Sequence, residues 1–365
     1  MGSISSQRRS ASASPSPPPV FNSSRYRVIA AFCPKEAGPS TNVFNCIQCY
    51  NPCHNTWEHV SIIPNLRENH VLKGFVMVSL GESVYVIGGR LWNKRNPRDS
   101  NESNEIPDVD VEVSALVLRY NVRLNKWSKC APLGTPRYDF ACCVCNDKIY
   151  VAGGKSGLNS TRGMTSAEVY DPVSGRWTDL PSMSTLRYKC VGVTWQGQIY
   201  VVGGFAEKDD SVPNMLTFSP QRCSAEVFHA GAEKWGLEAG MWQLDVPPNQ
   251  IVDVDGKLFS SGDCLNPWKG HIEAYDENLN MWTEVDGSRF NPPISAMERL
   301  YLTMAPIGTQ LYFFAGYRKA EEPTKTLSVV YIFDTLATVD AWRSLEPTEE
   351  EGKKELCSQC CVVQL

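Results

Sequence analysis

The sequence predicts an all-β protein made of repeated hairpins, and three observations support this. Strand-length apolar runs that are split by a polar turn and closed by two glycines recur, as in "RYDFACCVCNDKIYVAGG" up to Gly154 and "RYKCVGVTWQGQIYVVGG" up to Gly204. This pattern is typical of a β-hairpin. A second strand-like unit that ends in tryptophan follows each hairpin. Both units recur along nearly the whole chain, and such regular recurrence indicates a repeat architecture.

The repeats can be followed in order along the chain. Hairpins with the glycine pair, or a degraded form of it, end at these residues: Gly89, Gly154, Gly204, Gly262 and Gly316, the last with Ala315 in the first glycine position. The units that close on tryptophan end at these residues: Trp57, Trp127, Trp177, Trp235, Trp282 and Trp342. The sequence therefore predicts six repeats.

The order of these elements resembles the kelch family, whose marks are a double glycine after a strand, an aromatic residue in the next strand and a spaced tryptophan. The resemblance covers residues 27–365. It implies a six-bladed kelch-type β-propeller, in which each blade is a four-stranded antiparallel sheet and the blades surround a central channel. A small sheet cannot bury both faces alone, so each blade needs neighbours.

The repeated glycines and tryptophans are interpreted as structural residues. Glycine lets two backbones approach where a side chain would collide, and tryptophan fills the wedge between neighbouring blades. A glycine pair can also belong to a phosphate-binding loop. No helical pattern follows the pairs here, which argues against that interpretation.

The first blade lacks its innermost strand at the N-terminal end. Its second and third strands are expected at "YRVIAAFC" and "VFNCIQCYN", and its fourth from Trp57. The C-terminal "ELCSQCCVVQL" is similar to "YDFACCVC", the first strand of the third blade. We therefore expect one propeller domain over residues 26–365, with blade one shared between residues 26–62 and 355–365 and the ring closed by the C-terminal strand.

The cysteines are interpreted as buried apolar residues. The chain has 14 cysteines and no apolar signal segment, which favours a reducing compartment. Cys357, Cys360 and Cys361 are expected in the closing strand rather than as lipid acceptors, because Cys361 is too far from the C-terminus for a prenylation box. "CIQCYNPCH" has zinc-like spacing, but Cys46 and Cys49 would point to opposite faces of one strand. We predict no metal site and no cofactor.

Residues 1–25 are expected to form a disordered arm, because they are rich in serine and proline and contain no acid. Their start matches the N-myristoylation pattern with Gly2 as the acceptor, and Arg8 and Arg9 would add an electrostatic membrane signal. A plastid transit peptide is a less favoured alternative. We predict a cytoplasmic protein, with membrane association or a nuclear location as alternatives.

Two classes of partner are not expected. No apolar run is long enough to span a membrane, so contact with a bilayer would be peripheral and through Gly2. The net charge of −5 and the pI near 5.7 offer no electrostatic footprint for nucleic acid.

Basic residues recur at one position of the repeats. Arg137, Arg187 and Arg299 each stand 16 residues before the first residue of a glycine pair or its equivalent. Because loops that enter the innermost strands line one mouth of a propeller, these guanidinium groups are expected to converge there. Lys73 lies near the corresponding place in the second blade, and Arg90 opens a long loop there. With the tyrosines beside the arginines, the predicted partner-binding residues are Lys73, Arg90, Arg137, Tyr138, Arg187, Tyr188, Arg299 and Tyr301.

Such a ring is suited to carboxylate or phosphate recognition, because the planar guanidinium fork donates two parallel hydrogen bonds. The partner would be an acidic protein segment or an anionic small molecule. The alternative is that the arginines pair with acids of neighbouring blades, such as Asp139 or Glu298, and tie loops together. The long loops that start at Arg90 and Phe205 are expected to open from the same edge and add specificity.

The favoured function is a non-enzymatic protein-interaction module or scaffold. "LKGFVMVSLGESVYVIGGRLW" resembles the second blade of plant F-box and kelch proteins, which recruit substrates to ubiquitin ligases. The segment before the first repeat is expected to be too short and polar for an F-box, so direct adaptor activity is not expected. The protein would instead scaffold a complex or capture a client alone.

The alternative function is an enzyme of plant metabolism, lyase-like or isomerase-like, or a small-molecule binder that uses the same channel mouth. No catalytic motif is found, so an enzyme is the less favoured class. Candidate acid, base and thiol groups for that alternative are Tyr138, Asp139, Tyr188, Asp263, Cys264, Glu298 and Tyr301. A small-molecule site predicts a deep, partly apolar pocket, whereas a protein-binding site predicts a broad, shallow rim.

Overall fold

The computed structural model describes residues 23–35, 43–94, 109–208, 221–268, 270–290, 297–318, 322 and 324–365. The expectations about Gly2 and residues 1–22 lie outside these ranges, as does most of the two long loops. The described chain is all-β, as the sequence predicts. Its regular elements are antiparallel strands, apart from the 3-10 helix η1 (Ser23–Arg25).

Within the described residues, six sheets have four or five strands each. The first sheet contains β1 (Tyr26–Pro34), β2 (Cys46–Asn51), β3 (Thr56–Ile62) and β30 (Lys354–Gln364). The second contains β5 (Val76–Leu80), β6 (Ser83–Ile87), β9 (Val117–Asn121) and β10 (Lys126–Lys129). The third contains β11 (Ala141–Cys145), β12 (Lys148–Ala152), β13 (Ala167–Asp171) and β14 (Arg176–Leu180).

The other three large sheets follow the same order. The fourth contains β16 (Val191–Trp195), β17 (Gln198–Val202), β19 (Ser224–His229) and β20 (Lys234–Ala239). The fifth contains β21 (Ile251–Val254), β22 (Lys257–Ser260), β23 (Glu273–Asp276) and β24 (Met281–Glu284). The sixth contains β25 (Glu298–Ile307), β26 (Gln310–Arg318), β27 (Lys325–Asp334), β28 (Trp342–Ser344) and β29 (Thr348–Glu351).

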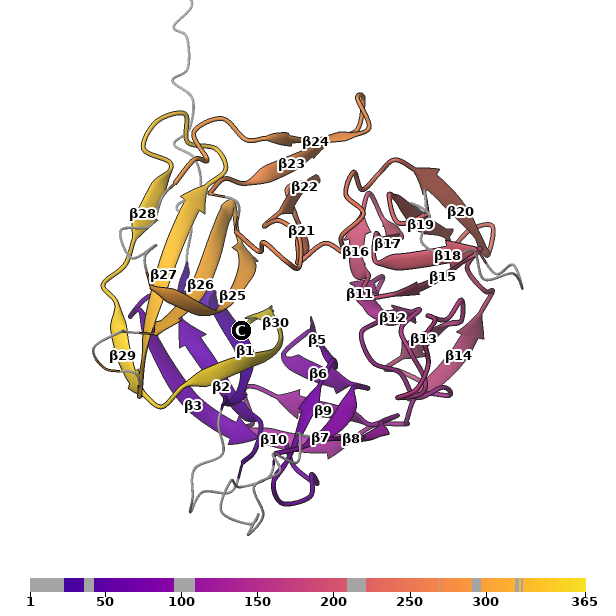
Figure 1. Ribbon diagram of the computed structural model, residues 1–365, viewed down its shortest axis with the longest axis horizontal. Coiled ribbons are helices and arrows are strands. Elements are labelled where there is room, and N and C mark those ends of the chain that lie inside the picture. Colours follow the sequence, from indigo (N-terminus) through magenta and orange to yellow (C-terminus); the bar gives the residue numbers. More distant parts are fainter. Residues whose placement is uncertain are drawn as a thin grey trace, which may run out of the picture.

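Two smaller sheets extend the second and fourth sheets at the ends of their hairpins. One contains β4 (His70–Lys73), β7 (Arg90–Asn93) and β8 (Val109–Val113), and the other contains β15 (Thr185–Tyr188) and β18 (Phe205–Lys208). Figure 1 shows the large sheets arranged around a common centre, with β30, β5, β11, β16, β21 and β25 innermost. Each of these inner strands contacts the next, and β30 contacts both β5 and β25. This arrangement is consistent with a kelch β-propeller.

The C-terminal strand pairs with the N-terminal strand, as the sequence predicts. β30 runs antiparallel to β1, with Val28 opposite Val362. It also bonds to other sheets: the Met77 backbone N–H donates to Ser358 Oγ at 3.2 Å, and Gln359 Nε2 donates to the Asn249 carbonyl at 3.2 Å. β30 therefore bonds to the first sheet, to the second sheet and to the segment that precedes β21.

The tryptophans lie between sheets, which is the structural role predicted for them. The indole N–H of Trp177 in the third sheet donates to the Ala131 carbonyl at 2.9 Å, and that of Trp282 in the fifth donates to the Met241 carbonyl at 2.7 Å. Each also packs on an aromatic of its own sheet, as Trp177 does on Tyr170 with ring centroids 5.1 Å apart. The ring contributes apolar area while its polar N–H stays bonded.

The glycine pairs allow neighbouring sheets to touch. Gly153 has a φ of +69°, and a Cβ there would lie 2.7 Å from the Arg187 carbonyl oxygen of the next sheet. The second glycine then donates its N–H to the same carbonyl, Gly154 N to Arg187 O at 2.8 Å. Only glycine combines this backbone angle with this approach.

Candidate functional site

The residues that enter an inner strand pair with the residues that follow a glycine pair. We call these the rim pairs, and they are Lys73 with Arg90, Tyr138 with Lys155, Tyr188 with Phe205, Pro248 with Asp263, and Arg299 with Tyr317. They come from the second to the sixth sheet in turn. Five of the eight partner-binding residues predicted from sequence lie on this rim.

Arg137 and Arg187 do not project from the rim, and this part of the sequence prediction is wrong. Both side chains are 0% exposed. Each precedes its rim residue and points back into its own sheet, where it donates to a glycine carbonyl: Arg137 to Gly153 at 2.8 Å and Arg187 to Gly203 at 2.9 Å. Their guanidinium groups serve the backbone and offer no atom to a partner at the surface.

These arginines join neighbouring sheets through hydrogen bonds in series. The Gly89 N–H of the second sheet donates to the Arg137 carbonyl of the third at 2.8 Å. The Arg137 guanidinium holds the Gly153 carbonyl, and the next residue, Gly154, donates to the Arg187 carbonyl of the fourth sheet. The alternative that arginines tie loops together therefore describes their geometry better, although the acid beside Arg137 is Glu168, at 2.6 Å, and not Asp139.

Of three further predicted residues, Lys73 and Arg299 lie on the rim but not in the position of Arg137 and Arg187, and Tyr301 lies off the rim. Lys73 shares its register with Tyr138 rather than with Arg137, and its Nζ pairs with Glu355 at 3.0 Å. Arg299 is partly exposed beside Tyr317, because a register shift separates it from the next paired residue of β25. Tyr301 is 7% exposed, and its hydroxyl lies 2.9 Å from Ser328 Oγ. Tyr301 is thus a core residue.

Cations stack on aromatic rings between neighbouring sheets. The Arg90 guanidinium of the second sheet lies 4.9 Å from the ring centroid of Tyr138 in the third. In the same way, Lys155 Nζ of the third sheet lies 4.0 Å from the ring of Tyr188 in the fourth. Such contacts contribute more when they are partly desolvated. They explain why the residue after the glycine pair, which sequence reasoning passed over at Lys155, is basic in both sheets.

The stack continues within the fourth sheet. The rings of Tyr188 and Phe205 are 5.0 Å apart, and the Arg222 guanidinium lies 5.3 Å from the Phe205 ring. Arg222 also pairs with Asp245 at 3.3 Å. Phe205 and Arg222 were missed because the sequence pattern contains no signal for contacts between a hairpin and the strand that follows its long loop.

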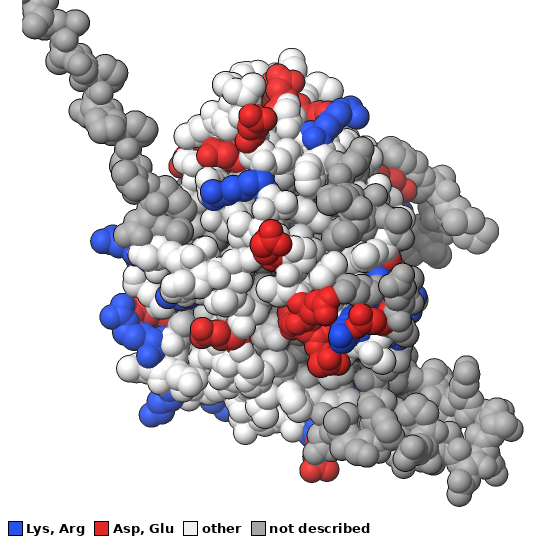
Figure 2. All heavy atoms as spheres, turned by 90° about the vertical axis from the view of Figure 1, so that its left-hand side faces the viewer, with Lys and Arg blue, Asp and Glu red and all other residues white. Residues whose placement is uncertain are grey.

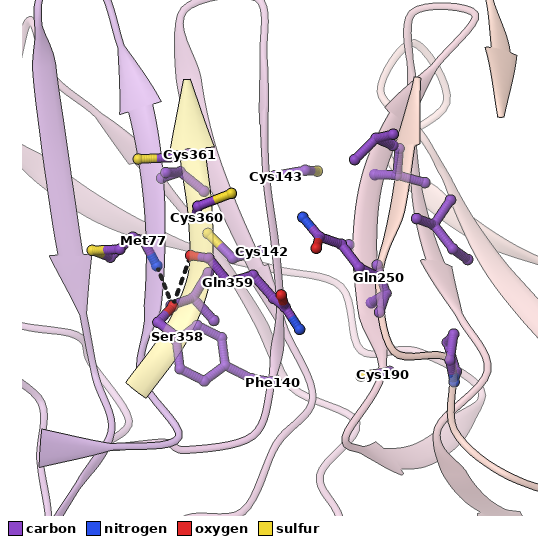
Figure 3. A pocket seen from close by; sticks show the side chains of 18 of the residues that line it. Met77, Phe140, Cys142, Cys143, Cys190, Gln250, Ser358, Gln359, Cys360 and Cys361 are labelled. Atoms are coloured by element: carbon purple, nitrogen blue, oxygen red, sulfur yellow. Dashed lines mark hydrogen bonds between the residues drawn. The ribbon is translucent and has the colours of Figure 1, made fainter. Parts of the chain in front are cut away.

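A cavity of about 620 Å³ lies between the inner strands. Figure 3 shows its wall, to which β30 contributes Ser358, Gln359, Cys360 and Cys361 and the third sheet contributes Cys142 and Cys143. The wall is largely apolar and rich in thiols. The small-molecule alternative predicts a partly apolar pocket, and this cavity has that character.

One end of the cavity is formed by the residues that follow the rim. Gly74, Asp139 and Lys189 take the same place in the second, third and fourth sheets, and their φ angles are +63°, +53° and +53°. Backbone hydrogen bonds join them: Asp139 N donates to Gly74 O at 2.9 Å, and Lys189 N donates to Asp139 O at 2.7 Å. Left-handed backbone is unfavourable for lysine, so this end of the cavity stores strain.

The two charged groups at this end are not neutralised by direct bonds. Burial raises the pKa of the Asp139 carboxyl, while Lys189, Arg90 and Lys155 act to lower it. Among the described residues, no hydrogen bond to the Asp139 carboxylate is found, and the exposed Lys189 side chain forms no ion pair there. Lys189 is exposed at this end of the cavity, and Asp139 is partly buried there.

The thiols of the cavity wall are unsuited to nucleophilic chemistry at neutral pH. Burial raises the pKa of Cys190 to about 11 and those of Cys143 and Cys360 to about 12. A thiol of this kind stays protonated, and the thiolate is the reactive form. Within the described ranges, no three His, Cys, Asp or Glu residues gather in a way that could hold a metal ion.

No helix in the described part of the chain has the length and apolar character that crossing a membrane requires.

Comparisons with known proteins agree with the repeat pattern. A family model described as the kelch motif matches residues 136–184. The chain is 31% identical over 208 residues to the F-box/kelch-repeat protein At1g16250 of Arabidopsis thaliana, covering 56% of this chain and 48% of the relative. It is 29% identical over 261 residues to the F-box/kelch-repeat protein OR23 of the same plant, covering 64% and 55%.

A human relative extends the similarity beyond plants. The Kelch repeat and BTB domain-containing protein 12 of Homo sapiens is 28% identical over 178 residues, covering 46% of this chain and 26% of the relative. The chain spans about half the length of the plant relatives named above, 48% and 55%. The chain therefore contains a kelch motif at residues 136–184 and is similar in its repeats to the plant F-box/kelch-repeat proteins.

Proposed function

We propose that the six large sheets are the blades of a closed six-bladed propeller. The contacts of β30 support this, because β30 is the inner strand of the first sheet and touches the inner strands of the second and sixth sheets. The Cys360 backbone N–H also donates to Thr303 Oγ1 of the sixth sheet at 3.1 Å. Closure would leave no unpaired sheet face between the first and last repeats.

We further propose that the protein is a non-enzymatic interaction module that binds an acidic protein segment at the rim. The observation that carries the proposal is the cation–aromatic stack of Lys155 and Tyr188, which spans two sheets next to the exposed Lys189. A carboxylate would find two ammonium groups there, and Tyr188 would add apolar area and a donor. Fixed rings and cations of this kind are typical of protein-binding surfaces.

The charge on other surfaces favours the rim as the docking place for an acidic partner. Figure 2 shows the side of the molecule that carries β28 and β29, where acidic side chains gather with basic ones between them. The exposed acids in this region are Glu346, Glu349 and Glu351. These acids would repel an acidic segment, because like charges brought together at an interface are unfavourable.

Affinity capture from a plant extract with charge-reversal variants tests the proposal. Lys155→Glu combined with Lys189→Glu should remove a bound protein that the unmodified chain captures, or weaken its binding about tenfold or more. Lys126→Glu combined with Lys129→Glu, on the exposed outer strand β10, is the matched control and should retain the partner. Equal capture by both double variants would place the binding surface elsewhere.

The cavity supports a second candidate, the binding of a small molecule with a hydrogen-bond donor for Asp139 and an anionic group for Lys189. A wall substitution, Val191→Phe, would narrow the cavity without touching the rim. If the variant loses a small molecule that the unmodified chain retains, as detected by native mass spectrometry, the cavity is the ligand site. If Val191→Phe still captures the protein partner that the Lys155→Glu and Lys189→Glu double variant loses, the rim is the binding site.

A further inference from the structure

Two cysteines that belong to no rim pair lie on paired strands near the buried ammonium group of Lys94. Cys33 is in β1 and is 1% exposed, while Cys357 is in β30 and is 9% exposed. Both belong to the same apolar core cluster. Lys94, whose side chain is 3% exposed, places its Nζ 3.7 Å from Cys33 Sγ.

The Lys94 ammonium is held in place by several partners. It donates to the Lys35 carbonyl at 3.2 Å and to the Pro34 carbonyl, and it lies 3.5 Å from a Glu355 carboxylate oxygen. Because these bonds fix the cation next to the Cys33 sulfur, the charge cannot move away when a thiolate forms. A positive charge beside a cysteine favours the thiolate.

Cys33 differs in this respect from the other thiols of the described chain. Burial raises the pKa of other buried cysteines, such as Cys190 and Cys360. The pKa of Cys33 is lowered, first by side-chain hydrogen bonding with Cys357 and then by the Lys94 charge, against the opposing effects of burial and Glu355. In the structure, the Cys357 thiol donates to the Glu355 carbonyl at 3.7 Å. Cys357 itself has a raised pKa and keeps its proton. The pair thus consists of one activated thiol and one protonated neighbour.

We propose that Cys33 and Cys357 form a redox-active dithiol, which a peroxide converts into a disulfide that covalently joins β1 to β30. The strand register supports this pairing. Cys33 lies opposite Glu355, and Cys357 falls two residues further along β30, in the register shift between Leu356 opposite Phe32 and Ser358 opposite Ala31. The dithiol shares Glu355 with the rim residue Lys73, but neither cysteine belongs to a rim pair or to the proposed contacts with the acidic partner.

The chemistry balances with hydrogen peroxide as the oxidant. The Cys33 thiolate attacks one peroxide oxygen, so that an S–O bond forms, the O–O bond breaks and hydroxide leaves, to be protonated to water. The Cys357 sulfur then attacks the Cys33 sulfenic acid, forming the S–S bond and breaking the S–O bond, and its proton leaves with the hydroxyl group as a second water. Two electrons pass from the two sulfurs to the peroxide. Cys357 lines the cavity and Cys33 does not, so a small oxidant would reach Cys33 from the Cys357 side of the pair.

The disulfide would act as a covalent closure of the repeat array. Cross-linking residues that are far apart in sequence restricts the unfolded chain strongly. Residues 33 and 357 enclose nearly all of the repeats. We therefore expect oxidation to raise the thermal unfolding midpoint by about 5 °C.

The test is peroxide titration of the full chain, followed by non-reducing peptide mapping and a thermal melt. The expected result is a Cys33–Cys357 cross-linked peptide and a higher unfolding midpoint. A thiol reductant should reverse both changes. Cys357→Ser should leave Cys33 trapped as sulfenic acid, detectable with a dimedone probe, whereas Cys361→Ser is the matched control and should still form the cross-link. A cross-link between other cysteines, or none, would overturn the proposal.

Alkylation kinetics of the unmodified chain provide a second test that does not depend on any variant folding. In the reduced protein under native conditions, iodoacetamide should modify Cys33 about tenfold faster than Cys190, which is similarly buried and whose pKa burial raises to about 11 despite the nearby Arg187 charge. Lys94→Met should abolish that difference. Equal rates for Cys33 and Cys190 in the unmodified chain would show that Cys33 is not activated.

Discussion

The third and fourth sheets hold an arginine in the same backbone frame but balance its charge differently. In the third sheet, the Glu168 carboxylate accepts from the Arg137 guanidinium at 2.6 Å. The same carboxylate accepts the backbone N–H groups of Gly134 at 2.7 Å and Thr135 at 3.1 Å. The buried charge therefore has a buried countercharge, which is itself fixed by the loop.

In the fourth sheet, the equivalent acid is drawn to other donors. Glu226 accepts the hydroxyl groups of Ser184 at 2.7 Å and Thr185 at 2.8 Å. Arg187 donates to Ser224 Oγ at 2.6 Å and to backbone carbonyls, as Arg137 does to Ser166 and Gly153, but among the described residues it has no hydrogen bond to the acid. Ser184 occupies the place of a glycine in the third sheet, so a hydroxyl is available there only in the fourth. The repeat fixes the backbone role of the arginine, and the preceding loop decides whether its charge is directly paired.

Removal of the Arg137 guanidinium should reduce the free energy of unfolding more than any other substitution considered in these two sheets. Arg137→Met leaves the buried Glu168 carboxylate and the Gly153 carbonyl without their partner, so we expect a loss of about 4 kcal/mol in the free energy of unfolding. Urea unfolding followed by tryptophan fluorescence measures it. Arg123→Ala is the control, because its ion pair with Glu82 is 59% and 44% exposed and should contribute less than about 1 kcal/mol. Similar losses in both variants would mean that the buried pair has no special role.

Substitution at a glycine pair should have the next largest effect, a loss of about 3 kcal/mol in the free energy of unfolding. Gly153→Ala combines a φ of +69° with a Cβ 2.7 Å from the Arg187 carbonyl, so both backbone strain and a clash between the third and fourth sheets are introduced. Gly81→Ala separates the two effects, because its φ is +56° but no atom lies within 4 Å. We expect about 1 kcal/mol there. If the two alanines prove equally destabilising in urea, close contact between sheets is not what selects the glycine.

Substitution of Glu168 and of Glu226 compares directly how the third and fourth sheets balance the arginine charge. Glu168→Gln removes the countercharge of Arg137 and should lower the free energy of unfolding by about 3 kcal/mol. Glu226→Gln keeps an oxygen acceptor for the Ser184 and Thr185 hydroxyls and removes no direct ion pair, so about 1 kcal/mol is expected. Both values come from the same urea titration at neutral pH. A larger effect at Glu226 would show that Arg187 depends on that charge across a longer distance.

The sequence was sufficient for those features that depend on local pattern. Hairpins, interleaved tryptophans and the pairing of β30 with β1 are all expressed as runs of apolar residues and turn residues. The direction of the Arg137 side chain was not predictable, because Arg137, which enters the sheet, and Tyr138, which lies on the rim, are consecutive residues. Counting residues also aligned Lys73 with the arginines, although strand register places it with Tyr138. Stacks such as Lys155 on Tyr188 depend on how neighbouring sheets meet, which local pattern does not encode.

The acid at the end of the cavity should make stability depend on pH. Burial raises the pKa of Asp139 above its ordinary 3.8, so the folded chain binds a proton at higher pH than the unfolded chain. The ionised carboxylate is therefore unfavourable at neutral pH, and stability from this group increases as the pH falls through its folded pKa. Asp139→Asn, which tolerates the same left-handed backbone, should be more stable than the unmodified chain at pH 7.

Melts between pH 7 and pH 3 test this prediction. The advantage of Asp139→Asn should shrink with decreasing pH and be absent below the ordinary carboxyl pKa of 3.8. Asp171→Asn is an exposed control whose own pKa is lowered by backbone hydrogen bonds from Val173 and Ser174, so its effect should have the opposite sign. An advantage that stays constant with pH would point to side-chain packing rather than charge.

Lys189 should give the smallest change in stability and separate function from folding. It has the same φ of +53° as Asp139, but lysine adopts left-handed backbone less readily than aspartate or asparagine. Lys189→Asn should therefore raise the free energy of unfolding by about 0.5 kcal/mol. The same variant should bind an acidic partner more weakly, since the exposed ammonium group is lost. If Lys189 is retained for recognition, Lys189→Asn should be more stable and bind the acidic partner more weakly. If Lys189→Asn is more stable and also binds more tightly, the strain at Lys189 has no role in recognition.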